Sequence, residues 1–390
     1  MSRGGERRDA SPAAPDDVAA AAAEGAPQGT PDGPPLDLLV VGAGPTGIAI
    51  GAEARRRELD VLLVEAGPLT AAIQAYPTDL TFFTTRDRLE IADVPFTVPE
   101  DKPSRRQALV YYRSVVDRYG VPVALHEEVV RIVPPAEPGG AFEVASVHRG
   151  QGRTRRARAV AVATGYFFNP NRLGAPGEDL PWVSSRYLDP YRHAGEHVVV
   201  VGAGNTAAEA ALDLWRNGVR VTLVHRGSEP RRSVKYWVKP DLENRIAEGS
   251  IAVRWGTLVA GFGEAGEERW VELRPAAEPE GRPEPLSCDA ASYEPLSCDP
   301  ASYEPLSCDA VYVLIGYEPD VTLQVDAGVE VDPDTLVPVH DPATCETNVP
   351  GLYVAGTLQA GEATDRIFIE NSREHAPKIV THLLQALGRH

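Results

Sequence analysis

Two short apolar runs stand out along the chain, and each leads directly into a glycine-rich turn and a segment with helical spacing. The first reads DLLVVGAGPTGIAIGAEA (37–54) and the second HVVVVGAGNTAAEAALDL (197–214). An unbroken Val/Leu run is typical of a strand buried on both faces of a parallel sheet. A further apolar run follows each helix, VLLVEAG at 61–67 and VTLVHRG at 221–227. The pattern predicts two βαβ units, and so an α/β fold with two Rossmann-like three-layer nucleotide-binding domains.

Outside these two units, the apolar pattern predicts two helices and three strands. Residues 105–118 have the apolar spacing of a helix, and VPVALHEEVVRI (121–132) resembles a strand. Two more strands are expected in AFEVASVHR (141–149) and ARAVAVATG (157–165), and a C-terminal helix in IFIENSREHAPKIVTHLLQAL (367–387). Pro377 lies within that last pattern, so we expect a kink or a new helix start there.

Each glycine-rich turn has the residues of a dinucleotide fingerprint. The leading glycine permits a tight turn, the second lets the backbone approach a pyrophosphate, and the third position keeps helix and strand close. Two copies, each after a strand and before a helix, are much stronger evidence than one. The first turn comprises Gly42, Gly44, Pro45, Thr46 and Gly47, and the second comprises Gly202, Gly204, Asn205, Thr206 and Ala207.

The two units differ in charge where the second strand ends. Glu65 closes the first unit, and a carboxylate there accepts hydrogen bonds from a ribose hydroxyl but repels a phosphate. His225 and Arg226 occupy the matching place in the second unit, followed by Arg231 and Arg232. A guanidinium group matches phosphate geometry, so we interpret this end as a 2′-phosphate pocket that selects NADPH over NADH. The alternative is a solvated basic loop.

The order of elements predicts a domain inserted within another. Residues 1–36 are rich in Ala, Pro, Gly and Asp, and we expect a disordered tail. We expect the first dinucleotide domain at 37–170 and 318–390, with the NADPH domain inserted at 171–317. Gly165 and Gly316 are the expected hinges.

A repeat of ten residues occurs late in the inserted domain. EPLSCDAASY (284–293) is followed by EPLSCDPASY (294–303) and EPLSCDA (304–310). We interpret 284–309 as an inert loop insertion, because long surface loops cost little closure entropy. The alternative is a Cys/Asp metal cluster, but the spacing is unlike that of known zinc sites, and no metal site is expected elsewhere.

Composition restricts the compartment and the partners. The formal net charge of −18 argues against nucleic acid and anionic membranes. Without an apolar run long enough to span a bilayer or a signal sequence, we expect a cytoplasmic protein. The chain has 4 cysteines and no CxxC, so a dithiol of the thioredoxin-reductase kind is absent.

Several longer stretches carry a resemblance to a known family. They are YPTDLTFFTTRDRLEIADVPF, ATGYFFNPNRLGAPGEDLP, VTLVHRGSEPRRSVKYWVKPDLENRI, ETNVPGLYVAG and RIFIENSREH. Together with the fingerprints they resemble flavoprotein reductases of the thioredoxin-reductase type, and more closely the YpdA-like family, described as bacillithiol disulfide reductases. The resemblance implies FAD and NADPH as cofactors, a small-molecule or small-protein electron acceptor, and the homo-oligomeric state frequent among such reductases. It also implies an NADPH domain that rotates to bring nicotinamide to flavin.

The resemblance assigns further cofactor contacts. The FAD contacts that it adds to the first fingerprint and Glu65 are Val130, Thr164, Gly165, Gly356, Thr357 and Ile367. On the NADPH side it adds Gly316.

Two positions depart from the expected patterns. The family has Cys where this chain has Thr46, its candidate catalytic position, and threonine cannot form a thiolate or a mixed disulfide. The wider superfamily has Asp where this chain has Thr357. The YpdA-like family lacks this Asp as well. The substrate implied by the family is a bacillithiol-type disulfide, but direct transfer to a quinone, oxygen or a ferredoxin-like acceptor gains weight.

Two other functions remain open. A flavin monooxygenase is one, although Ser184 and Ser185 stand where that family has His. A non-catalytic NADPH sensor is the other, because the candidate thiol is missing. Aromatic residues near 76–83 could line the flavin or pack in the core, and Lys235, Tyr236, Trp237 and Lys239 could close over a nucleotide or be solvated.

Overall fold

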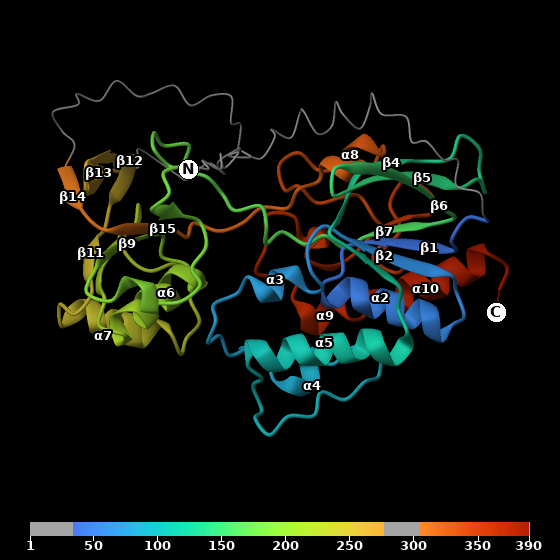
Figure 1. Ribbon diagram of the computed structural model, residues 1–390, viewed down its shortest axis with the longest axis horizontal. Coiled ribbons are helices and arrows are strands. Elements are labelled where there is room, and N and C mark those ends of the chain that lie inside the picture. The colour runs from blue at the N-terminus through green and yellow to red at the C-terminus, as the bar shows by residue number, and fades with distance from the viewer. Residues whose placement is uncertain (1–33, 277–303, 390) are drawn as a thin grey trace, which may run out of the picture.

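The computed structural model describes residues 34–276 and 304–389. Figure 1 shows two groups of elements side by side, which we name by sequence. The terminal lobe comprises the described residues of 34–170 and 318–389, and the central lobe those of 171–317. Most of the predicted tail and the first two copies of the repeat lie outside the described residues.

The terminal lobe is built on a five-stranded parallel sheet of order β16-β7-β1-β2-β3. Its strands are β1 (Leu38–Val41), β2 (Val61–Glu65), β3 (Val123–Leu125), β7 (Val160–Val162) and β16 (Leu352–Val354). Helices cover one face: α2 (Pro45–Arg56), α5 (Arg105–Tyr119) and α10 (His375–Ala386). An antiparallel sheet covers the other: β4 (Glu127–Val133), β5 (Phe142–His148) and β6 (Gln151–Ala157). Short helices complete the lobe: α3 (Ala71–Gln74), α4 (Arg86–Leu89), α8 (Thr322–Asp326) and α9 (Ile369–Ser372).

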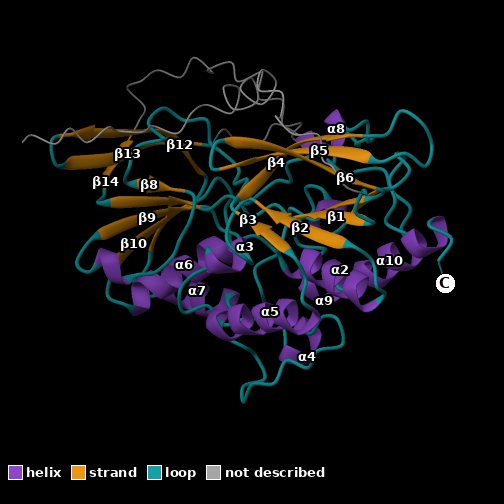
Figure 2. Ribbon diagram, turned by 45° about the vertical axis from the view of Figure 1, so that its right-hand side comes forward, coloured by secondary structure: helices purple, strands orange, loops and turns teal. Residues whose placement is uncertain are grey.

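The central lobe repeats this three-layer plan, as Figure 2 shows. Its parallel sheet has the order β11-β10-β9-β15-β8. The strands are β8 (Val183–Ser184), β9 (His197–Val201), β10 (Arg220–Val224), β11 (Ala252–Arg254) and β15 (Ala310–Val313). Helices α6 (Asn205–Arg216) and α7 (Lys239–Ala247) lie on one face, and an antiparallel sheet forms the other outer layer: β12 (Thr257–Ala265), β13 (Glu268–Pro275) and β14 (Glu304–Ser307). The predicted fold class is confirmed.

The buried apolar residues divide between the same two lobes. The four hydrophobic clusters among the described residues each stay within one lobe, two in each. The two connecting segments meet in an isolated antiparallel bridge between Pro170 and Tyr317. Among the described residues each lobe therefore has its own apolar interior, and the insertion of one domain within another stays a prediction.

Some elements differ from the prediction. The expected strand at 121–132 is divided into β3 and β4 at His126, whose φ of +55° no regular strand accommodates. Strand β6 was missed, because its arginine-rich sequence lacks an apolar alternation. The C-terminal segment forms two helices, and the new helix start expected near Pro377 is present: Pro377 lies in the first turn of α10, where its missing N–H is not needed.

Candidate functional site

The turn between β1 and α2 has no room for a side chain at Gly42 or Gly47, while the space beside Gly44 is open. Gly42 has a φ of +105°, and a Cβ atom there would lie 2.6 Å from the carbonyl oxygen of Ala163. A Cβ at Gly47 would lie 2.1 Å from the carbonyl oxygen of Gly42. No side chain caps α2, so its first backbone N–H groups are free to bind an anion.

The turn between β9 and α6 has the same construction. Gly202 has a φ of +122°, and its Cβ would lie 2.3 Å from the carbonyl oxygen of Leu314. Ala207 occupies the third position, where its methyl group is fully buried. Helix α6 also lacks a side-chain cap. The chain therefore has two cradles of the kind that hold a dinucleotide pyrophosphate.

The first cradle brings together residues far apart in sequence. Thr46 Oγ1 lies 2.9 Å from Ser372 Oγ in α9, and a Cβ at Gly356 would lie 3.1 Å from the same Thr46 oxygen. Thr357 Oγ1 would lie 3.6 Å from a Cβ at Gly165. Sequence reasoning missed Ser372, although it lies in the family-like stretch RIFIENSREH.

His375, at the start of α10, fixes the neighbouring loop. Its Nδ1 accepts the Gly356 N–H at 3.0 Å, and the residue is 7% exposed. Burial, with smaller contributions from Lys378 and His340, lowers the pKa of His375 to about 4. The ring is therefore neutral at physiological pH and keeps Nδ1 as an acceptor, which orients the Gly356–Thr357 segment.

The Glu65 carboxylate is held by backbone groups at the end of the first unit. Glu65 Oε2 accepts the Ala43 N–H at 2.7 Å and Oε1 accepts the Gly67 N–H at 2.9 Å. These bonds fix the carboxylate at the end of β2, and each oxygen retains a second lone pair for a ribose hydroxyl. Val130 lies at a bulge where β4 pairing with β5 skips one residue, so its backbone groups are outside the ladder.

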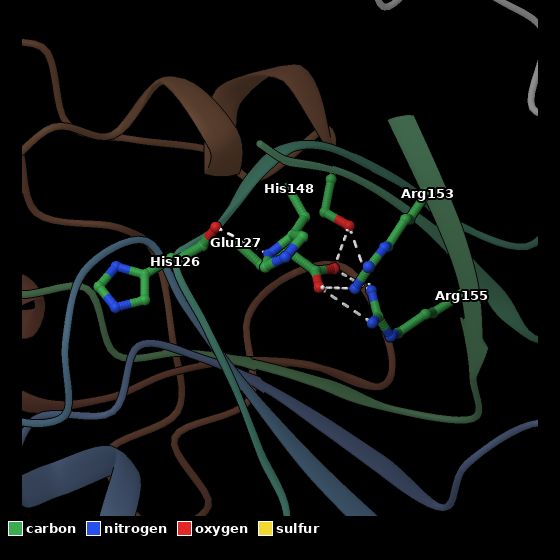
Figure 3. Close-up of polar contacts among 6 residues, drawn as sticks. His126, Glu127, His148, Arg153 and Arg155 are labelled. Carbon is green, nitrogen blue, oxygen red and sulfur yellow. Dashed lines mark hydrogen bonds and ion pairs between the residues drawn. The ribbon is translucent and has the colours of Figure 1, made fainter. Parts of the chain in front are cut away.

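A buried ion cluster holds β4 just before that bulge (Figure 3). Glu127 is fully buried and accepts hydrogen bonds from Arg153 at 2.9 Å, from Arg155, and from Ser146 Oγ at 2.5 Å. Burial alone would raise the pKa of Glu127, but the bonds from Arg155 and Ser146 outweigh it and hold the pKa below its usual value. The cluster joins all three strands of the antiparallel sheet.

Three of the four predicted basic residues interact electrostatically in the second unit. Arg226 and Arg231 both act on His225, whose pKa is lowered mainly by burial and then by these two charges. The backbone N–H of Arg231 donates to Ala203 in the turn at 3.0 Å. A bound 2′-phosphate would offset this concentrated positive charge. Arg232 is exposed, and no contact in the described part of the chain joins it to the others.

The other predicted positions are placed as follows. Thr164 borders the first turn, its N 3.2 Å from a Cβ at Gly42, and Asn205 binds the segment after β10 through both amide atoms. Gly316 accepts the Asn171 N–H where the lobes connect. The Thr206 hydroxyl forms no hydrogen bond within the described ranges, and Ile367 is half-buried.

Neither described cysteine suits thiol chemistry. Cys308 and Cys345 are both buried, and burial raises the pKa of Cys308 to about 12 and that of Cys345 above its ordinary value. A buried thiol with a raised pKa is a poor nucleophile. Within residues 34–276 and 304–389 there is also no metal-binding group of three His, Cys, Asp or Glu residues, and no helix suited to crossing a membrane.

Two uncapped, glycine-walled cradles on separate parallel sheets define the class: an α/β protein that binds two dinucleotides. Comparison with known proteins gives the family. Residues 39–268 match the model described as Pyridine nucleotide-disulphide oxidoreductase, and the chain belongs to this family and is an oxidoreductase.

Individual relatives agree with this family. The chain is 33% identical over 351 residues to Bacilliredoxin reductase Bdr of Bacillus subtilis (strain 168), covering 88% of this chain and 96% of that protein. It is similar to the solved Bacillithiol Disulfide Reductase Bdr (YpdA) from Bacillus cereus, with 31% identity, a TM-score of 0.78, and coverage of 90% and 99%. The protein of that title from Staphylococcus aureus has 29% identity, a TM-score of 0.76, and coverage of 90% and 98%. The resemblance inferred from the sequence is confirmed.

Proposed function

We propose that this chain is an NADPH-dependent FAD flavoprotein that passes a hydride from NADPH through FAD to a low-molecular-weight disulfide such as bacillithiol disulfide. The observation that carries the proposal is the pair of cradles with opposite charge at their adenosine ends, Glu65 in one and His225 with two arginines in the other. The names of the Bacillus and Staphylococcus relatives support the disulfide as acceptor. Per turnover, NADPH and one proton reduce one disulfide to two thiols.

The terminal lobe has the residues to hold FAD. The narrow first turn would receive the pyrophosphate, Glu65 a ribose, and the backbone of Val130 the adenine. The remaining contacts in this assignment are Thr164, Gly165, Gly356, Thr357 and Ile367. Bound there, FAD supplies the two-electron chemistry that connects a nicotinamide with a disulfide.

The central lobe has the residues to hold NADPH. The second turn would receive its pyrophosphate, while His225, Arg226 and Arg231 would bind the 2′-phosphate. Arg232 and Gly316 complete this assignment. An acidic protein needs such local positive charge to bind an anionic coenzyme.

In this proposal the chain's own residues hold the cofactors and the disulfide in place, and none of them forms a covalent intermediate. Thr46, the candidate catalytic position, offers a hydroxyl that is hydrogen-bonded to Ser372, and neither described thiol is nucleophilic. We therefore propose that the disulfide receives electrons without a covalent bond to residue 46. His375 keeps the Gly356 N–H satisfied beside that position.

The acceptor is tested by reoxidation of the FAD-loaded, NADPH-reduced protein. Mixed without oxygen in a stopped-flow instrument, bacillithiol disulfide should restore the oxidised flavin spectrum faster than a quinone or a ferredoxin. An oxygenated product formed with NADPH consumption would instead identify a monooxygenase. Fast reduction by NADPH that no acceptor reverses would identify a sensor.

The coenzyme is tested by Arg226→Glu, which removes a guanidinium and adds a repulsive charge. We expect the Kd for NADPH to rise about 10- to 100-fold, the range for a hydrogen bond to a charged group, and that for NADH to change little. Arg220→Glu, the same charge change at the other end of β10, is the matched control. An unchanged preference between the two coenzymes would contradict the 2′-phosphate assignment.

A further inference from the structure

The segment between β10 and α7, residues 225–238, is bound to the second cradle by three hydrogen bonds; we call it the coenzyme loop. Arg231 N–H donates to the Ala203 carbonyl at 3.0 Å. Asn205 accepts the Lys235 N–H at 2.9 Å through Oδ1 and donates to the Ser233 carbonyl at 3.1 Å through Nδ2. Any movement of the loop is therefore coupled to the turn that would receive the coenzyme pyrophosphate.

The far end of the coenzyme loop contacts the terminal lobe. The Trp237 ring meets Phe83 edge-on with the ring centroids 5.7 Å apart, and Lys102 Nζ lies 5.2 Å from the Trp237 centroid. A second contact places Lys235 Nζ 5.5 Å from the ring centroid of Phe368. Phe368 immediately precedes α9, which carries the Ser372 partner of Thr46. One loop thus connects the second cradle to the surroundings of the first.

These contacts between the lobes lie at the surface and involve few side chains. Trp237 remains 43% exposed and Phe83 38% exposed, so neither ring is fixed by a core. Aromatic and cation–π pairs at exposed sites are individually weak, and such a contact can open and close without unfolding either lobe. It therefore influences how the lobes are oriented more than whether they fold.

We propose that Trp237 is a positioning residue that holds the two dinucleotide sites in one relative orientation, and that binding of a 2′-phosphorylated nucleotide to the coenzyme loop changes its contact with Phe83. The inference rests on the proposed function, since it takes NADPH as the ligand of the loop. The physical basis is linkage, because a ligand that favours one arrangement of the loop also favours the lobe contact that this arrangement makes.

Two tryptophans make the test selective. The ring centroid of Trp255 is 6.0 Å from that of His225, so Trp255 reports on the 2′-phosphate site, while Trp237 reports on the lobe contact. The FAD-loaded protein is labelled with 5-fluorotryptophan and titrated with NADP⁺, which cannot reduce the flavin, with 2′,5′-ADP, and with NAD⁺. Trp237→Phe and Trp255→Phe assign the two ¹⁹F resonances, each by the loss of one signal.

We expect NADP⁺ and 2′,5′-ADP to shift both resonances with the same midpoint, and NAD⁺ at equal concentration to shift neither. A shift of the Trp255 resonance with the Trp237 resonance unmoved would overturn this inference and leave the proposed function standing. If neither moves at saturating NADP⁺, the coenzyme assignment fails, and the inference fails with it.

A kinetic test separates positioning from nucleotide affinity. Trp237→Ala should slow flavin reduction at saturating NADPH at least about fivefold, the lower range of coupling between sites. The limiting rate at saturation does not depend on the Kd, so it reports positioning even though linkage also changes the Kd for NADP⁺. Trp237→Phe should recover most of the rate. Tyr236→Ala is the matched control, because this neighbouring residue is 82% exposed and its ring meets Trp237 edge-on, with no other ring pair among the described residues. An unchanged rate in Trp237→Ala would overturn the positioning role.

Discussion

At the scale of single residues, the site depends on groups that stay neutral or small. His375 is a buried imidazole whose Nδ1 satisfies the Gly356 N–H, and protonation would remove that acceptor. Gly42 and Gly47 have no room for a methyl group beside the carbonyl oxygens that they approach. These constraints are local, so a substitution at one of them affects the cradle directly.

The lowered pKa of His375 predicts a pH dependence of stability. Above pH 6.5 the ring is neutral in both folded and unfolded chains, and below it the unfolded chain takes up the proton first, so stability falls until about pH 4. Between pH 7 and pH 5 the loss amounts to about 2 kcal/mol. His375→Gln keeps an acceptor but cannot titrate, so urea unfolding at the two pH values should show a loss smaller by that amount.

The control for His375→Gln is His126→Asn, at an exposed histidine whose φ of +55° asparagine tolerates. It should retain the wild-type difference between pH 7 and pH 5. Equal losses in the wild type and in His375→Gln would show that His375 is not the group responsible.

At the scale of elements, the repeat has a structural part. Residues 284–303 lie outside the described residues, but the last copy, within the expected insertion 284–309, forms strand β14 and pairs with β13 from Trp270↔Ser307 to Leu273↔Glu304. Cys308 then packs in the core of the central lobe. The final copy is thus a strand of the sheet, and only the two copies before it remain candidates for an inert insertion.

Removing the two earlier copies tests that interpretation. Deletion of 284–303 shortens the connection between β13 and β14 to residues 276–283 and leaves EPLSCDA intact for β14. If the copies are inert, the free energy of unfolding of the central lobe should rise by about 1 kcal/mol from the smaller closure entropy, with unchanged flavin content. A destabilised protein, or loss of flavin, would show that the copies contribute contacts.

The elements show which features sequence could predict. Both cradles were predictable because their residues are adjacent in sequence and the glycine requirement is local, as at Gly42 and Gly202. The contact of Thr46 with Ser372, the ion cluster at Glu127 and the pairing of Trp237 with Phe83 were not, because each joins segments distant in the chain. Periodicity identifies a buried face but not the partner across it.

At the scale of the whole molecule, the two lobes have separate cores, and the chain enters and leaves the central lobe at adjacent points, Pro170 and Tyr317. The predicted boundaries 171 and 317 remain a prediction, which the folding of the isolated segment would test. We expect residues 171–317 produced alone to unfold cooperatively in urea and to bind 2′,5′-ADP with an affinity within about tenfold of that of the full chain. A fragment without a cooperative transition would show that the terminal lobe is needed for its folding.

The coenzyme loop also has a consequence for how such an enzyme can evolve. Arg231, beside the predicted phosphate pocket, and Trp237, against the other lobe, are separated by one short stretch anchored to Asn205. If the loop has the role proposed above, mutations in this stretch that change nucleotide preference should also alter the geometry between the lobes. A lineage that exchanges one coenzyme for another would need compensating changes at Phe83 or Lys102, far from the altered pocket in sequence.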